Sequence, residues 1–276
     1  MPGFAERFAE FARLRSPLCL GLDPSEEVFA AWGLKSDASG LERFCGTVLE
    51  AVGDSLPVVK PQAAFFERFG PAGMAQLAQA AAQLRRQNVL SLIDAKRGDV
   101  PGTMQGYAAA MLGADSGFGG DAMTVSAYLG FEALRPTFER AAATGAAVFV
   151  VVHSSNPEGR ALQSARMADG RSVSQTLADA VTTENRLAPG VVGAVVGATL
   201  SQEEAGILDR LSGALLLAPG VGAQGATLDA VASRFACAQG RVIPSVSRDI
   251  LMKGPSVAGL RTAIDRYRDQ AWAVLG

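Results

Sequence analysis

Residues 89–99 of the chain read VLSLIDAKRGD, an apolar run that ends abruptly in a cluster of alternating charges. The run over 89–94 is almost continuously apolar, which is typical of a parallel strand covered on both faces. A helical pattern follows at 103–112, and the same unit of strand, polar corner and helix recurs along the chain. This stretch therefore predicts an α/β fold made of repeated β-α units.

Repetition of that unit predicts the architecture. We expect strands at residues 17–22, 56–60, 89–94, 121–127, 146–152, 191–198, 214–218 and 241–246. We expect helices at 40–52, 71–87, 103–112, 130–143, 173–187, 201–211, 225–238 and 255–273. Alternation of this kind over 276 residues fits a (β/α)8 TIM barrel, which is typically about 250 residues long. We predict one domain over residues 1–276 with an amphipathic N-terminal helix at about 3–14. The alternative is a doubly wound open sheet.

Composition removes several classes of function. The chain has one His, so a multi-His metal site is excluded and a histidine-driven nucleophile would depend on His153 alone. Three widely spaced cysteines without a CxxC pair argue against a disulfide framework or thiolate zinc site and favour a reducing cytoplasm. A net charge of −2 gives no general attraction to nucleic acid or acidic lipid. The longest apolar run, 146–152, is far shorter than the ~20 residues of a membrane span.

The charged cluster DAKRGD is the first candidate for chemistry. Asp94 and Lys96 are two residues apart, so both side chains project to the same side of an extended strand end, at the mouth of a barrel. Asp99 follows in the loop, and Lys60 ends the preceding predicted strand. An array of two lysines and two aspartates can be dehydrated because each charge has an opposite neighbour, and Lys96 should keep a proton to deliver. The alternative is a solvated loop with a salt bridge.

A second candidate is APGVGAQG at 218–225, after the seventh predicted strand. It matches the G-x-G-x-x-G dinucleotide pattern, but it is followed by one strand only and lacks the expected acid about 20 residues later. Glycines let backbone N–H groups approach an anion, and a helix starting near Gly225 would add its positive end. Arg248 follows strand eight, where barrels often bind phosphate. We interpret this pair as a phosphate site; the alternative is an ordinary turn beside a surface arginine.

A third candidate is the polar segment after the fifth predicted strand, Ser155-Asn156-Pro157. It offers a hydroxyl and an amide on a stiffened turn, which suits recognition of a planar polar ring. A plain Asx or ST turn explains it equally well. His153 ends an apolar strand and is interpreted as structural.

Together these motifs resemble the orotidine 5′-phosphate decarboxylase family, most closely its bacterial branch that carries DAKRGD. The resemblance covers essentially the whole chain, through LGLDP at 20–24, VVKPQ at 58–62, DAKRGD at 94–99, SNP at 155–157, APGVGAQG at 218–225 and VSR at 246–248. Each motif is weak or moderate alone, but the combination is highly specific. The resemblance implies a (β/α)8 homodimer that converts orotidine 5′-monophosphate (OMP) to uridine 5′-monophosphate (UMP) without a metal or cofactor.

The resemblance also implies roles for individual residues. Lys96 would protonate the carbon that loses CO2, with Asp94 and Lys60 in the same subunit and Asp99 and Thr103 reaching the partner's site. Lys60 and Asp23 would engage the ribose, Ser155 the pyrimidine edge, and Gln224 the space between pyrimidine and phosphate. The phosphate would be held by Pro219, Gly220, Gly222 and Arg248.

Two departures from the family pattern and three competing functions accompany this prediction. Pro101 stiffens the loop after Asp99, and His153-Ser154 stands where threonine is expected, which leaves open whether Ser154 or Ser155 contacts the pyrimidine.

A related Mg²⁺-dependent sugar-phosphate decarboxylase or synthase carries an acid at the end of strand two, where this chain has Lys60, and an ammonium repels a divalent cation. The motifs are also compatible with a non-catalytic barrel that binds a nucleotide phosphate and with an NAD-binding protein.

Overall fold

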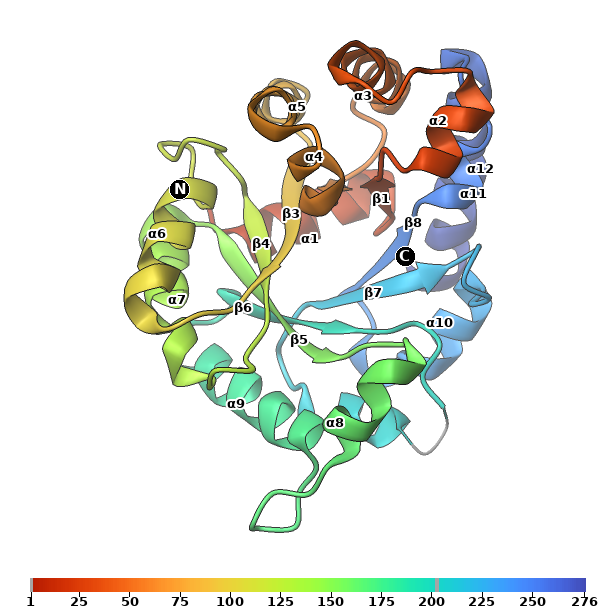
Figure 1. Cartoon of the computed structure of the whole chain (residues 1–276). Helices are drawn as coiled ribbons and strands as arrows, with labels where there is room; N and C mark the ends of the chain where they lie inside the picture. The colour runs from red at the N-terminus through yellow and green to blue at the C-terminus, as the bar shows by residue number, and fades with distance from the viewer. Residues whose placement is uncertain (1, 202–203) are drawn as a thin grey trace.

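A closed parallel barrel forms the centre of the protein (Figure 1). The structure, a computed structural model, describes residues 2–201 and 204–276. The strands follow one another in chain order, and β8 pairs with β1 to close the barrel. Their bounds are β1 (Cys19–Leu22), β2 (Val58–Pro61), β3 (Leu90–Arg97), β4 (Ala122–Val125), β5 (Ala147–His153), β6 (Val192–Val196), β7 (Leu216–Val221) and β8 (Val242–Val246). The predicted (β/α)8 fold is confirmed, and each predicted strand overlaps an observed one.

The helices surround the barrel, as Figure 1 shows. The longer ones are α1 (Phe4–Arg15), α3 (Ala38–Val52), α5 (Gly70–Arg86), α6 (Pro101–Met111), α7 (Arg135–Thr144), α9 (Val173–Leu187) and α12 (Val257–Leu275). Shorter ones are α2 (Glu26–Trp32), α4 (Ala63–Glu67), α8 (Arg160–Ser164), α10 (Leu228–Arg234) and α11 (Arg248–Leu251). The 3₁₀ turns are η1 (Glu132–Leu134), η2 (Pro157–Gly159), η3 (Ala205–Arg210) and η4 (Ala236–Ala238). Within the described ranges, no helix has the length and apolar content needed to cross a bilayer.

Two hydrophobic layers hold this arrangement together. The inner layer fills the barrel with residues such as Leu92 and Phe149, and α1 closes it by inserting Phe4 and Phe8. Phe4 meets Phe149 edge-on at 5.7 Å between ring centroids, a favoured aromatic geometry. The outer layer lies between the strands and the surrounding helices. Because α1 packs into this inner layer, the opposite end of the barrel, where the strands end, is free to form a site.

The helical boundaries near the strand ends differ from the sequence prediction. The predicted helix at 225–238 begins only at Leu228, where the Thr227 hydroxyl accepts from the Ala230 N–H at 3.1 Å. The predicted helix at 201–211 is the 3₁₀ segment η3, and its residues 202 and 203 lie outside the described chain. The short helices α2, α4, α8 and α11 were not predicted, because four to seven residues are too few to show a helical period.

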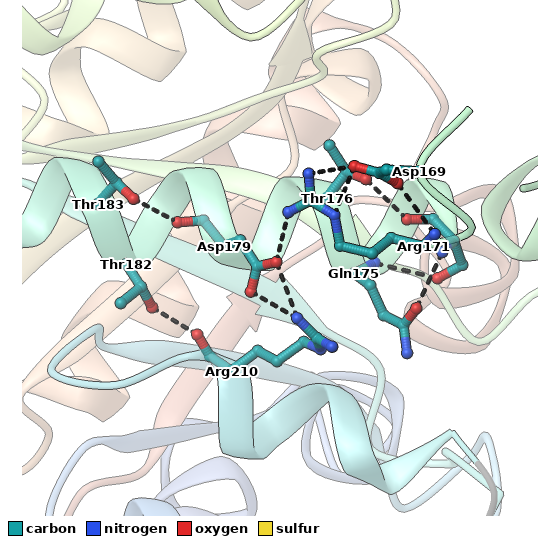
Figure 2. Close-up of polar contacts among 9 residues, drawn as sticks. Asp169, Arg171, Gln175, Thr176, Asp179, Thr182, Thr183 and Arg210 are labelled. Carbon is teal, nitrogen blue, oxygen red and sulfur yellow. Dashed lines mark hydrogen bonds and ion pairs between the residues drawn. The ribbon is translucent and has the colours of Figure 1, made fainter. Parts of the chain in front are cut away.

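A polar cluster on the outside of the barrel ties two of the connecting segments to α9 (Figure 2). Asp179 of α9 accepts from Arg171 at 2.7 Å and from Arg210, at the end of η3, at 2.8 Å. Thr182, one turn further on, donates to the Arg210 carbonyl at 2.5 Å. The segments that follow β5 and β6 are therefore anchored to one helix.

Candidate active site

A cavity of about 670 Å³ opens at the carboxyl ends of the strands. Most of the predicted site residues line it: Asp23, Lys60, Asp94, Lys96, Ser155, Pro219, Gly220, Gln224 and Arg248. Asp99, Thr103 and Gly222 are not among the residues that line it. The topology explains the convergence, because parallel strands in a barrel all deliver their last residues to the same rim.

One buried carboxylate bridges two lysines at the base of the cavity. Asp94 Oδ2 accepts from Lys60 Nζ at 3.0 Å, and Asp94 Oδ1 accepts from Lys96 Nζ at 2.6 Å. The side chains of Lys60 and Asp94 are 6% and 8% exposed, whereas that of Lys96 is 46% exposed. Lys96 is therefore the most exposed member of the array, and Asp94, itself paired with Lys60, holds its ammonium.

Thr124 and Gln62 fix this carboxylate and the strand that carries it. The Thr124 hydroxyl donates to Asp94 Oδ1 at 2.7 Å and accepts from the Lys96 backbone N–H at 2.9 Å. Gln62 Nε2 donates to the Asp94 carbonyl at 3.3 Å. Lys96 has φ of +46°, in the left-handed region that a residue with a side chain adopts rarely and mainly at functional sites. This backbone turn aims the ammonium back at Asp94.

The opposite charges of the array keep one another ionised. Burial alone would raise the pKa of Asp94, but Lys60 and Lys96 outweigh it and hold that pKa well below its usual value. Burial opposes the charge on Lys60, yet Asp94 and Asp23 outweigh it and raise the Lys60 pKa above its usual value. Asp94 and Lys60 thus remain an ion pair across the neutral pH range, and their fixed field acts on whatever enters the cavity.

The far end of the cavity carries Pro219, Gly220, Gln224 and Arg248. Gly220 has φ of +108°, a conformation in which a side chain would be strained, and a Cβ there would lie 3.0 Å from Gln224 Oε1. The Arg248 side chain is 47% exposed, and its guanidinium lies 3.7 Å from the Glu27 carboxylate. The helix α10 begins at Leu228 and not near Gly225 as predicted, so its N-terminus is not at the glycine turn. The positive charge at this end of the cavity is that of Arg248.

Gly222 lies on the other side of this turn. Its N–H donates to the Ala226 carbonyl at 2.8 Å, and the Gly225 N–H donates to the Gly222 carbonyl at 2.7 Å. The N–H of Gly222 is therefore used to close the turn, and we assign Gly222 a role in its shape.

The loop after β5 distinguishes the two serines. The Ser154 N–H donates to Gln163 Oε1 at 3.1 Å, Gln163 Nε2 donates to Ser154 Oγ at 2.6 Å, and Ser154 Oγ donates to Asn156 at 2.6 Å. Ser154 is thus engaged within its own loop, which favours Ser155 as the serine that meets a ligand. His153 is buried, with Nδ1 3.3 Å from Ser174 Oγ, and burial lowers its pKa.

Asp23 lines the cavity and carries one buried carboxylate oxygen without a partner in the described part of the chain. Its Oδ1 is buried and has no hydrogen-bond partner among residues 2–201 and 204–276. A buried oxygen without a partner is costly and suits a ligand hydroxyl. Asp99 instead lies in the loop after β3, where its Oδ1 accepts from the Val100 N–H at 2.7 Å, and Thr103 is exposed on α6.

Comparisons with known proteins agree with this geometry. Residues 16–263 match the model of the orotidine 5′-phosphate decarboxylase / HUMPS family. A Myxococcus xanthus protein named orotidine 5′-phosphate decarboxylase is 48% identical over 96% of this chain and 93% of its own length. The chain belongs to the orotidine 5′-phosphate decarboxylase family. A Salinispora tropica protein of the same name is 48% identical over 100% of this chain and 99% of its own.

The fold of the family is also matched in solved structures. The crystal structure of a candidate orotidine 5′-phosphate decarboxylase from Streptomyces avermitilis superposes with a TM-score of 0.93 at 44% identity. The match covers 100% of this chain and 96% of the other. The barrel described above is therefore that of the decarboxylase family.

Sequence reasoning missed the residues that orient the array. Thr124 was not identified, although it is the polar residue within the run AMTV of β4 and its hydroxyl contacts Asp94. A hydroxyl in an otherwise apolar strand is the signal that could have revealed it, because buried polar groups require partners. Gln62 was recognised only as part of VVKPQ.

Proposed function

We propose that this protein decarboxylates OMP to UMP and CO2, the last step of de novo pyrimidine nucleotide synthesis, without a metal or cofactor. The observation that carries the proposal is the Lys60–Asp94–Lys96 array at the base of the cavity, with only Lys96 largely exposed to it. Decarboxylation leaves an electron pair on the C6 carbon, and a fixed cation beside that atom stabilises the developing charge. Family membership and the named relatives support the same reaction.

The chemistry assigned to the array is a proton transfer after C–C cleavage. The bond between C6 and the carboxylate breaks, CO2 leaves, and the electron pair remains on C6. Lys96 Nζ then donates a proton to form the C6–H bond, and the neutral amine regains a proton from solvent. Asp94, 2.6 Å from Lys96 Nζ, aims the ammonium, and its negative charge lies at the side from which the substrate carboxylate departs.

The rest of the cavity orients the nucleotide along its length. Arg248, with Gly220 and Pro219, holds the phosphate at the end remote from Lys96, and Gln224 reaches towards pyrimidine and phosphate. Ser155 contacts the pyrimidine edge, and the unpartnered Asp23 oxygen accepts from a ribose hydroxyl beside Lys60. Binding energy gained at the phosphate is thereby used to align a distant reacting carbon.

The direct test is to add the protein to OMP with a chelator present and to follow the pyrimidine absorbance. We expect complete conversion to UMP, at a rate that the chelator does not change. Loss of activity with the chelator would favour the Mg²⁺-dependent sugar-phosphate enzyme, although Lys60 at the end of β2 opposes a divalent cation. Tight UMP binding without conversion would favour a non-catalytic barrel, and NAD binding would favour a dinucleotide-binding protein.

Arg248→Ala tests the phosphate end. We expect UMP binding to weaken by about 1.5–3 kcal/mol, or roughly 10- to 150-fold in Kd, because one charge-assisted contact is lost. Calorimetric titration with UMP measures this change, with Arg261→Ala on α12 as a surface control. Unchanged UMP affinity in Arg248→Ala would remove the phosphate role.

We also propose a homodimer in which Asp99 and Thr103 enter the partner's site. Asp99 does not line the cavity of its own chain, and the end of β3 meets the loop after β4 where the Ser126 N–H donates to the Arg97 carbonyl at 2.8 Å. Beside Asp99, Val100 is 55% exposed, and Tyr128 and Leu129 in the second loop are also exposed. Exposed apolar residues beside a charged loop suit contact with a second copy.

Mixing two inactive variants tests this arrangement. Lys96→Ala and Asp99→Ala should each be inactive as pure proteins, but subunit exchange should restore about one quarter of wild-type activity. Half of a random mixture is hybrid, and each hybrid has one site with both native residues. If Asp99 acts in its own subunit, no hybrid site is complete and the mixture stays inactive.

We further propose that residues 1–276 work as one domain in a reducing cytoplasm. Cys19, Cys45 and Cys237 are all free thiols. Burial raises the pKa of both Cys19 and Cys45 to about 12, which makes these thiols unreactive.

A further inference from the structure

A second cavity of about 490 Å³ lies behind the turn that follows β7. It shares Val221 with the first cavity and is lined by the outer side of the turn, by Asp249 of α11 and by Tyr267 of α12. Neither Asp249 nor Tyr267 lines the first cavity. Both are thus close to the phosphate end of the site without reaching the space where a nucleotide would lie.

Asp249 is held between α12 and the turn. The Tyr267 hydroxyl donates to Asp249 Oδ2 at 2.7 Å, and Tyr267 is buried with 9% of its surface exposed. On the other side, a Cβ placed on Gly222 would lie 2.7 Å from Asp249 Oδ2 and 2.8 Å from its Cγ. The carboxylate therefore occupies the space of a missing side chain at Gly222, whose φ of +81° also requires glycine.

Contact at Gly222 is transmitted to the whole turn. The hydrogen bonds that join Gly222 to Ala226 and Gly225 make residues 222–226 a closed unit, so the position of Gly222 sets the position of Gln224 within it. On its own element, Asp249 directly follows Arg248 at the start of α11. The Asp249 carboxylate thus fixes the spacing between the turn and Arg248. The turn and Arg248 together line the phosphate end of the cavity.

We propose that Asp249, held by Tyr267, is a positioning residue that sets the geometry of the phosphate end of the site. This inference rests on the proposed function and deepens it, because it assigns the spacing between Gln224 and Arg248 to a contact outside the cavity. A direct contact between Asp249 and phosphate would be repulsive, which fits a carboxylate placed behind the turn. Burial, followed by the hydrogen bond to Asp249, raises the Tyr267 pKa, so the hydroxyl keeps the proton that it donates.

Tyr267→Phe is the cleanest variant, because it deletes one hydroxyl and leaves the ring in place. Loss of a hydrogen bond to a charged acceptor should weaken UMP binding about 10-fold. Affinity for uridine, which lacks the phosphate, should be unchanged, and kcat/KM for OMP should fall together with the affinity for UMP. Thr262→Val is the control, since it removes from the same helix a hydroxyl that donates to the Ala258 carbonyl of that helix.

A double variant separates positioning from a general effect on stability. If Tyr267 acts through Asp249, then Tyr267→Phe should add no further loss of UMP affinity to Asp249→Ala. Equal losses for UMP and uridine, additive losses in the double variant, or a fall in melting temperature alone would overturn the inference. Turnover of OMP by the wild-type protein tests the proposed function separately, because the ratio of UMP to uridine affinity does not depend on catalysis.

Discussion

Lys96→Ala is expected to lower kcat for OMP by about 10⁴-fold or more while UMP still binds. A general acid typically contributes 10²–10⁴-fold, and a preorganised charge beside a developing anion about 10²–10³-fold, so the loss of both is larger than either. UMP affinity should change little, because the proposed phosphate contacts are made by Arg248 and by the turn after β7, and not by Lys96. The measurement is kcat from single-turnover kinetics together with Kd for UMP by calorimetry.

The control for this prediction is Lys35→Ala, since Lys35 is exposed and lies outside the cavity. A Lys96→Ala protein that kept turnover within tenfold of wild type would exclude Lys96 as the proton donor. A variant that lost UMP binding as severely as turnover would instead assign Lys96 to the binding of the nucleotide.

How far the sequence anticipates this site can be seen at the strand ends. Lys60 and Asp94 were predictable because each directly follows an apolar run, and Lys96 because it comes two residues after Asp94; a barrel brings such strand ends to one rim. Their spacing of two on an extended strand also predicted that Asp94 and Lys96 face the same way. The two side chains do meet, at 2.6 Å, but through the left-handed backbone of Lys96 and not through an extended strand end. The periodicity of apolar residues is therefore sufficient to locate the base of the cavity.

Features that depend on contacts between distant elements could not be predicted in this way. Thr124 reaches Asp94 because β3 and β4 are neighbours whose register shifts at this point, where Ile93 pairs with Met123 but Arg97 pairs with Val125. The left-handed backbone of Lys96 is imposed by its surroundings, since a lysine has no local preference for that conformation. The turn after β7 was predicted from its glycines. The hydrogen bonds of these glycines close the turn on itself, so α10 begins only at Leu228.

Asp94→Asn has the second of the two largest expected effects, because it removes the charge that separates two ammonium groups. Lys60 Nζ and Lys96 Nζ both contact this carboxylate, at 3.0 and 2.6 Å. Without the charge, the buried Lys60 loses its counterion, and removal of one partner of a buried pair costs about 3–5 kcal/mol. We expect a comparable fall in the free energy of unfolding by urea, and a fall in kcat of about 10³-fold as Lys96 loses its alignment.

A second substitution distinguishes the electrostatic cause from a packing defect. In the double variant Asp94→Asn/Lys60→Met the uncompensated buried charge is gone, so stability should recover while kcat remains low. Asp115→Asn is the matched control, because its carboxylate is exposed and pairs with Arg140 at the surface, where ion pairs are worth little. If the double variant is no more stable than Asp94→Asn alone, the cost comes from the hydrogen bond to Thr124 and not from the charge on Lys60. Because Lys60 itself lines the cavity, a low kcat is expected in the double variant whatever its stability. Recovery of stability alone therefore decides whether Asp94 stabilises the fold by compensating the buried charge of Lys60.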